Sequence, residues 1–142
     1  ASGQARYEEK HFTGLFVSDV DAALAWYRDK LDFEVIDTVN NTGSGYKFAL
    51  LAWNGTLVEM IEHPNVVTGE QIKECYPENT GIRGFFKPGF YVKDLEGYQD
   101  RLKSRNVTVL YPVLKAEGFA RKLRLFIIED LEGNMIQFFN YP

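Results

Sequence analysis

The fold is decided by a short stretch of sequence that occurs twice, as Gly14-Leu15-Phe16-Val17-Ser18-Asp19 and as Gly89-Phe90-Tyr91-Val92-Lys93-Asp94. Both copies read Gly-x-x-Val-x-Asp, and they begin 75 residues apart. Each copy continues into apolar residues at helical spacing, and its Asp is a residue type that caps the first turn of a helix. A repeat of this kind predicts two copies of one small structural unit within the 142 residues.

The sequence after each predicted helix indicates three strands, the last two of them joined by a tight turn. β-branched and aromatic residues favour strands at 33–38 and 107–110. Gly55 and Gly133 stand where a tight reversal needs a positive φ. The closing strands align at an offset of 78 residues. The aligned pairs are Phe48 with Phe126, Leu50 with Ile128, Gly55 with Gly133, Leu57 with Met135, and Glu59 with Gln137.

These elements predict a single α+β domain over residues 1–142, built from two tandem βαβββ modules at about 10–63 and 84–141. The segment 64–83 is expected to be a linker with one helical turn near 70–74. A helix covers only one face of each sheet, so the other face needs a partner, which the sister module supplies. We therefore expect curved mixed sheets around a cleft.

The composition is that of a folded protein, with 45% apolar and 25% charged residues. The aromatic share of 15% suits broad apolar faces or an aromatic-lined pocket. A formal charge of -4 without a basic run argues against nucleic acid as a partner.

The sequence says less about the cellular location of the protein than about its fold. Cys75 is the one cysteine, so it forms no intrachain disulfide, and this fits a reducing compartment. No apolar stretch approaches the ~18 residues that span a bilayer, and no basic-then-apolar leader is present. We expect a cytoplasmic protein without a membrane partner, and leave open whether a leader preceded Ala1.

The sequence resembles the vicinal oxygen chelate superfamily, which includes glyoxalase I, bleomycin-resistance, fosfomycin-resistance and extradiol dioxygenase proteins. The resemblance rests on residues 16–20 with 25–33, on 56–62, and on 129–138. Its most specific part is the turn Asp130-Leu131-Glu132-Gly133-Asn134 before the final strand. The resemblance covers most of the chain and implies the paired βαβββ modules around a cleft.

Metal-dependent members of that superfamily hold a divalent ion with His or Glu side chains from equivalent strands of both modules. The resemblance maps those positions onto Phe12, Glu59, Lys87 and Gln137. Phe has no donor atom, Lys offers a repelling charge, and a Gln is a weak neutral ligand. Only Glu59 matches, so we expect neither a metal nor another cofactor.

The two histidines do not restore a metal site. His11 is next to Phe12 on a strand and so points to the opposite face. His63 shares the face of Glu59, but four residues along a strand is ~13 Å, too far for both to hold one ion. We expect surface or packing roles for both histidines.

The four mapped positions suggest a ligand site in the cleft, in which the Lys87 ammonium replaces the charge of the ion. The preferred function is metal-independent binding of a planar or aromatic molecule, as resemblance to the metal-free bleomycin-resistance branch implies. Phe12, Phe16 and Phe139 would form aromatic walls, while polar groups orient the ligand. The orienting residues are Glu59, Lys87 and Gln137.

Three alternatives stay open beside ligand binding. In a lyase or isomerase, Glu59 would be the general acid or base and Lys87 would stabilise negative charge on the substrate. A divalent-metal-dependent enzyme of the glyoxalase or dioxygenase type is the second alternative. The third is a structural role, with Glu59 and Lys87 as an ion pair and the aromatic residues covering a homodimer interface. A homodimer is expected in any case, and the sequence does not identify the ligand.

Overall fold

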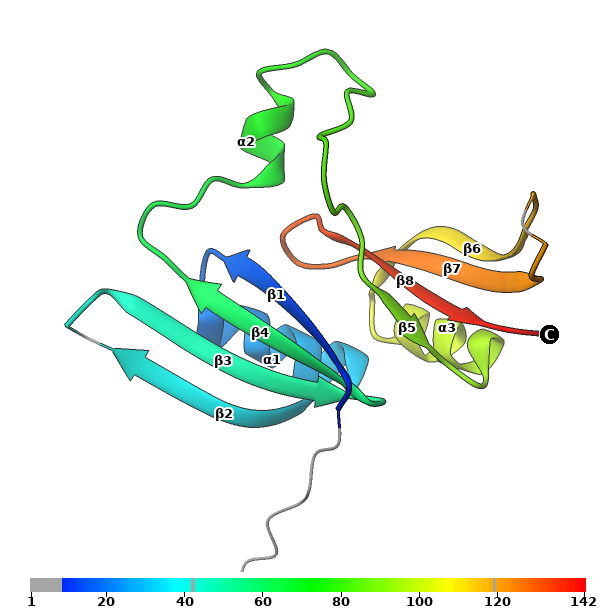
Figure 1. The fold of residues 1–142 in the computed structure, drawn as a ribbon, viewed down its shortest axis with the longest axis horizontal. Coiled ribbons are helices and arrows are strands. Elements are labelled where there is room, and N and C mark those ends of the chain that lie inside the picture. Colours follow the sequence, from blue (N-terminus) through cyan, green and yellow to red (C-terminus); the bar gives the residue numbers. More distant parts are fainter. Residues whose placement is uncertain (1–8, 42, 119) are drawn as a thin grey trace, which may run out of the picture. The chain divides into compact units, whose positions relative to one another are not determined.

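The computed structural model describes residues 9–41, 43–118 and 120–142, and it divides into two compact units that meet between Val66 and Val67. Each unit contains one four-stranded mixed sheet in the order first, last, third, second strand (Figure 1). In both sheets the first and last strands run parallel and the other neighbours antiparallel. The predicted pair of βαβββ modules is confirmed.

The first unit contains five elements. They are β1 (His11–Val17), α1 (Val20–Leu31), β2 (Glu34–Asn41), β3 (Tyr46–Trp53) and β4 (Thr56–Glu62). Helix α1 begins where predicted, because the Asp19 carboxylate accepts a 2.9 Å hydrogen bond from the N–H of Ala22. Every third or fourth residue of α1 is buried, from Val20 to Leu31, and these face the buried side chains of the sheet. Helix α1 leaves the other face of the sheet uncovered.

The second unit contains six elements. They are α2 (Gly69–Lys73), β5 (Gly89–Tyr91), α3 (Leu95–Ser104), β6 (Thr108–Ala116), β7 (Leu123–Glu129) and β8 (Met135–Asn140). Asp94 caps α3 as Asp19 caps α1, accepting from the N–H of Gly97 at 3.0 Å. Tyr98 of α3 meets the ring of Phe138 edge to face, with centroids 4.9 Å apart, so an aromatic core fixes the helix on its sheet.

The predicted helical turn of the linker is α2, which starts in a capping box. The Thr68 hydroxyl accepts from the N–H of Gln71, and the Gln71 side chain accepts from the N–H of Thr68. Among the described residues, no helix is both long and apolar enough to cross a membrane.

The predicted alignment of the third strands is wrong by one residue. Leu50 pairs with Glu59, whereas Ile127, not Ile128, pairs with Gln137. The offset is therefore 77 residues in this strand and 78 in the last one, because the turn of the second hairpin is one residue longer. The slip reverses the face: Phe48 lies on the open side of its sheet, while Phe126 is fully buried beneath α3.

The strand predicted at 107–110 is also longer than expected, because β6 continues to Ala116. It passes Pro112 through two register shifts, between Val109 and Tyr111 and between Tyr111 and Leu114. A proline donates no ladder hydrogen bond, and bulges of this kind are where a strand accommodates one.

Candidate functional site

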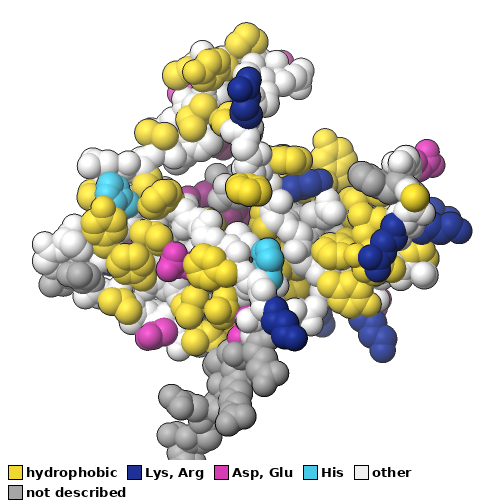
Figure 2. Space-filling view, in the orientation of Figure 1, with side chains coloured by type: hydrophobic (Ala, Val, Ile, Leu, Met, Phe, Trp, Pro, Cys, Tyr) yellow, Lys and Arg dark blue, Asp and Glu magenta, His cyan; other side chains and the backbone are white. Residues whose placement is uncertain are grey.

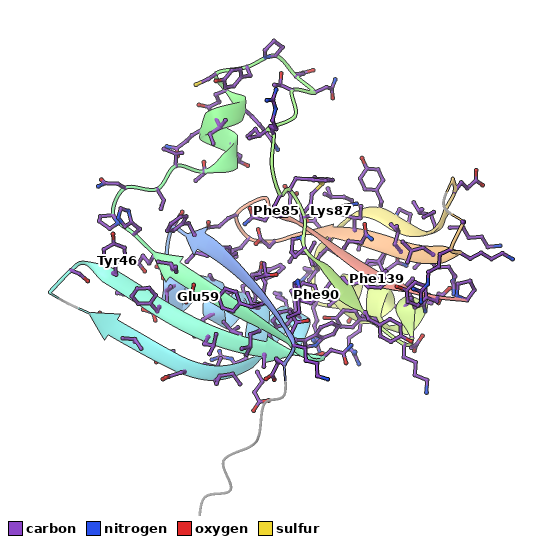
Figure 3. All side chains as sticks on the ribbon, viewed as in Figure 1. Tyr46, Glu59, Phe85, Lys87, Phe90 and Phe139 are labelled. Carbon is purple, nitrogen blue, oxygen red and sulfur yellow. The ribbon has the colours of Figure 1, made fainter. Side chains whose placement is uncertain are left out.

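The open face of the first sheet carries a carboxylate among aromatic and aliphatic side chains. Glu59 is half-buried on β4 and lies opposite Gly14 of β1. A Cβ atom on Gly14 would lie 3.7 Å from Glu59 Oε1 and 3.7 Å from the Phe12 ring. The missing side chain of Gly14 thus leaves the carboxylate next to the aromatic ring, and Figure 3 shows Glu59 in the middle of this sheet.

Phe12 and Phe16 project from β1 on this open face, as alternation along the strand predicts. Their side chains are 54% and 61% exposed, although neighbouring Val17 on the opposite face is buried. Figure 2 shows hydrophobic side chains gathered over the strands of this sheet. Exposed rings next to a carboxylate form a surface that suits a planar ligand with a polar group.

His63 belongs to an aromatic cluster that sequence reasoning did not include in the site. Its ring meets Tyr46 at 4.6 Å and Phe16 at 6.2 Å between centroids, both at steep angles, and Tyr46 stacks on Phe48. Nδ1 of His63 accepts a hydrogen bond from the N–H of Asn65 at 3.0 Å. These contacts agree with the packing role expected for His63. Tyr46 and Phe48 could have been found from their alternation along β3.

In the second module, Lys87 and Gln137 are brought together. Lys87 Nζ donates a 2.6 Å hydrogen bond to Oε1 of Gln137, and both side chains are half-buried. Lys87 precedes β5, and the carbonyl of Pro88 accepts from the N–H of Gln137, which fixes the segment beside β8. The Lys87 ammonium, which was predicted to stand in for the charge of a metal ion, therefore has the amide oxygen of Gln137 as a partner within this module.

Phe139 lies two residues beyond Gln137 on the same face of β8. Tyr91 lies opposite it on β5, and the two rings meet edge to face at 6.1 Å. Tyr141 joins them at 5.8 Å from Phe139, and the Arg121 guanidinium lies over the Tyr141 ring at 3.8 Å. Alternation along β5 and β8 could have located both tyrosines. The sequence did not indicate that Arg121 lies beside Tyr141, because its position depends on how the β6–β7 hairpin folds.

A separate hollow of about 560 Å³ lies within the second unit. It is lined by α2 and the linker residues after it, up to Ile82, and by Tyr111 and Met135 from the sheet. None of the predicted site residues lines it. The predicted residues lie instead on the sheet faces opposite the helices. Phe12, Phe16 and Glu59 are in the first module, and Lys87, Gln137 and Phe139 are in the second.

The side chains at the mapped positions offer few donor atoms for a divalent metal. Within residues 9–41, 43–118 and 120–142, no three side chains of the His, Cys, Asp and Glu types are grouped as metal ligands would be. In the second module, the Gln137 oxygen already accepts from a cationic ammonium. A metal ion would have to displace that charge, so these residues do not fit one.

Comparison with known proteins identifies the family. Residues 10–138 match the model of the "Glyoxalase/Bleomycin resistance protein/Dioxygenase superfamily". The chain belongs to this superfamily. A search of curated proteins found no match.

Solved structures of the superfamily fold match the chain over most of its length. TioX from Micromonospora sp. ML1 is 18% identical to this chain, with a TM-score of 0.68. The match covers 93% of this chain and 98% of the TioX chain. A glyoxalase family protein from Enterococcus faecalis is 17% identical with a TM-score of 0.72, covering 94% and 98%. A glyoxalase I mutant from Zea mays is 16% identical with a TM-score of 0.69, covering 92% and 44%. At these identities the likeness establishes the fold alone.

Proposed function

We propose that this superfamily member binds a planar or aromatic small molecule on the open faces of its sheets, without a metal and without turnover. Phe12 and Phe16 would stack on the ligand in the first module, and Phe139 in the second. Glu59, Lys87 and Gln137 would orient its polar groups. The arrangement of the two faces around a common cleft stays a prediction from the sequence.

One observation carries the proposal: large aromatic side chains remain exposed on the sheet face that α1 leaves uncovered. Phe12 and Phe16 are more than half exposed, and they flank the half-buried Glu59. Because each ring is about half exposed, leaving it in water forgoes roughly 0.8 to 1.5 kcal/mol of burial, which a ligand can recover. Binding is favoured over catalysis because Glu59 has no nucleophile or second acid at hydrogen-bonding distance among the described residues.

A thermal-shift screen with planar aromatic antibiotics and small oxo-acids tests whether the chain binds such a molecule. A compound present at a hundred times its Kd should stabilise the fold by about 2.7 kcal/mol and raise Tm by several degrees. Phe16→Ala should weaken a hit at least tenfold. Phe85→Ala, which removes an exposed ring outside both sheets, is the matched control and should leave affinity unchanged.

Glu59→Gln separates binding from catalysis, because it removes the charge and keeps the shape. We expect the variant to change the affinity for a hit, with no chemical change of that compound by either protein. Loss of a measurable turnover with binding retained would instead establish Glu59 as a general acid or base. Elemental analysis of protein purified without chelator should find less than one equivalent of divalent metal, and a full equivalent would contradict metal independence.

A further inference from the structure

We propose that the sheet face of the second module opposite α3 recognises a planar aromatic carboxylate, with Arg121 as the group that binds the carboxylate and Lys87 as a second cation at the other end of the aromatic surface. This inference rests on the proposed function and names the chemical class of ligand. It concerns one surface, the aromatic strip, defined as Tyr91, Phe139 and Tyr141, together with the cation at each of its ends.

The aromatic strip is built by alternation on two parallel strands. Tyr91 of β5 pairs with Phe139 of β8, and Tyr141 follows two residues later on the same face. The three ring centroids are 5.8 to 6.3 Å apart, and two of the three pairs meet edge to face. Tyr91 and Tyr141 are 45% and 41% exposed, so ring surface is available to a ligand.

Gly89 keeps the surface beside the strip open. It pairs with Gln137 and precedes Tyr91 by two residues, so it occupies the same face. A Cβ there would lie 3.5 Å from the Phe139 ring. Without it, a flat molecule has access to the side of that ring.

A cation lies at each end of the strip. Lys87 contacts Gln137 at one end, and Arg121 covers Tyr141 at the other. Gln137 and Tyr141 are four residues apart, which corresponds to ~13 Å along an extended chain. Figure 2 shows Lys and Arg side chains gathered around the end of this unit where the chain terminates, and Figure 3 shows Lys87 and Phe139 at separate positions along it. This length accommodates a two-ring aromatic system with its carboxylate at one end.

Both cations retain donors for an anion. Lys87 uses one N–H on Gln137, and an ammonium has three. The Cζ atom of Arg121 lies 3.8 Å from the centroid of the Tyr141 ring, and a guanidinium in contact with a ring still has N–H groups that can form a bidentate pair with a carboxylate. A guanidinium held against a ring is also preorganised, so less side-chain entropy is lost on binding.

The acidic residues of this unit do not neutralise the two cations. Within its described part, neither Lys87 nor Arg121 forms an ion pair, whereas Arg124 on the helix-covered face pairs with Glu96. Glu129 lies on the same face as Gln137. Its position in β7 is opposite Met135 of β8, on the side of Gln137 away from the strip. Glu117 lies exposed in the β6–β7 hairpin. Charge complementarity therefore favours an anionic ligand.

Three probes of one shape test the inference: 2-naphthoate, the neutral 2-naphthamide and the cationic 2-naphthylmethylamine, titrated calorimetrically against the whole chain. We expect 2-naphthoate to bind at least tenfold more tightly than the amide, and the amine to bind most weakly. Raising the salt concentration should weaken naphthoate binding and leave amide binding unchanged.

Variants identify the anion-binding group. Because naphthoate has one carboxylate, which lies at the Arg121 end of the strip, Arg121→Gln should weaken naphthoate binding about tenfold without affecting the amide, whereas Lys87→Gln should change it by less than about twofold. Lys122→Gln, in the same hairpin as Arg121, is the matched control. Arg121→Glu should reverse the order of the carboxylate and the amine. Arg121 is exposed and Lys87 half-exposed, so an unchanged Tm is expected for all four variants.

The outcomes separate this inference from the proposed function. Equal binding of all three probes, or an effect of Lys122→Gln as large as that of Arg121→Gln, would overturn the carboxylate assignment and leave planar-ligand binding standing. Binding of none of the probes, together with an empty antibiotic screen, would overturn both.

Discussion

Asp94 and Asp19 cap their helices in the same way, but the residues that donate to them differ. The donor is Gly97 in the second module and Ala22 in the first. A Cβ on Gly97 would collide with the Asp94 carboxylate, whereas the backbone around Asp19 accommodates the methyl group of Ala22. The Asp94 cap and a side chain at position 97 are therefore in competition.

Gly97→Ala tests this competition in a double-mutant cycle. Alanine stabilises a helix by about 1 kcal/mol over glycine, while loss of an Asp cap costs about the same. We expect almost no net change in unfolding free energy when Gly97→Ala is made alone, and a gain of about 1 kcal/mol when it is made on top of Asp94→Ala. Denaturant unfolding measures both. Equal effects in the two backgrounds would show that the cap and the methyl group coexist.

Alternation along a strand correctly predicted which face of the sheet individual side chains occupy. The exposure of Phe12 and Phe16, and the half-burial of Glu59, follow from the position of Val17 toward α1. The hydrogen bond from Lys87 to Gln137 was not predicted, because a long flexible side chain has several groups within reach. Its bond to Gln137 depends on how Pro88 docks the segment against β8.

At the scale of elements, the two hairpins differ in their turns. Asn54 and Gly55 both adopt positive φ, at 48° and 82°, which makes a two-residue turn between β3 and β4. In the second hairpin the Asp130 carboxylate accepts from the N–H groups of Glu132 and Asn134, and a longer turn results. An insertion is tolerated there because the turn absorbs it. Within a strand it would invert the faces of the following side chains.

Gly55→Ala should destabilise the first module by about 1 to 2 kcal/mol, because an L-residue at this positive φ is strained. No atom lies within 4 Å of the added methyl group, so the cost is conformational and not steric. Gly81→Ala is the control, since that position has equal room and no positive φ, and it should change stability by less than about 0.5 kcal/mol. A loss of equal size in both variants, measured by chemical denaturation, would contradict the turn strain.

The elements themselves were predictable because caps, turn glycines and strand alternation are local signals. Helices α1 and α3 are capped by the predicted aspartates, and the turn at Gly55 has the predicted backbone. The single-residue offset in the third strands and the extension of β6 past Pro112 were not predicted. Both depend on pairing between strands, which the sequence of either strand alone does not contain.

At the scale of the whole molecule, the repeat and the family motifs predicted the superfamily, which the match over residues 10–138 confirms. Ligand chemistry was less accessible to sequence reasoning. Arg121 reaches Tyr141 only because the hairpin between β6 and β7 returns beside the end of β8. The expected homodimer and the common cleft remain predictions.

The segment between α2 and β5, within the second unit, exposes two adjacent aromatic rings. Phe85 is fully exposed and Phe86 is 63% exposed, in a stretch without helix or strand. Phe12 and Phe16 are comparably exposed, but their backbone is held in the β1–β4 ladder. A protease must draw an extended stretch of backbone into its active site, and a strand that is paired in a sheet resists this.

Brief treatment with chymotrypsin should therefore cut first after Phe85 or Phe86, giving fragments of about residues 1–86 and 87–142 by mass spectrometry. First cleavage after Phe16, or after the buried Phe126, would contradict the exposed-segment account. The cleaved bond precedes Lys87 directly or by one residue. Lys87 and its hydrogen-bond partner Gln137 would therefore both remain in the C-terminal fragment. Glu59 lies on the N-terminal side of the cut, so cleavage separates the polar residues of the first module from those of the second in the covalent chain.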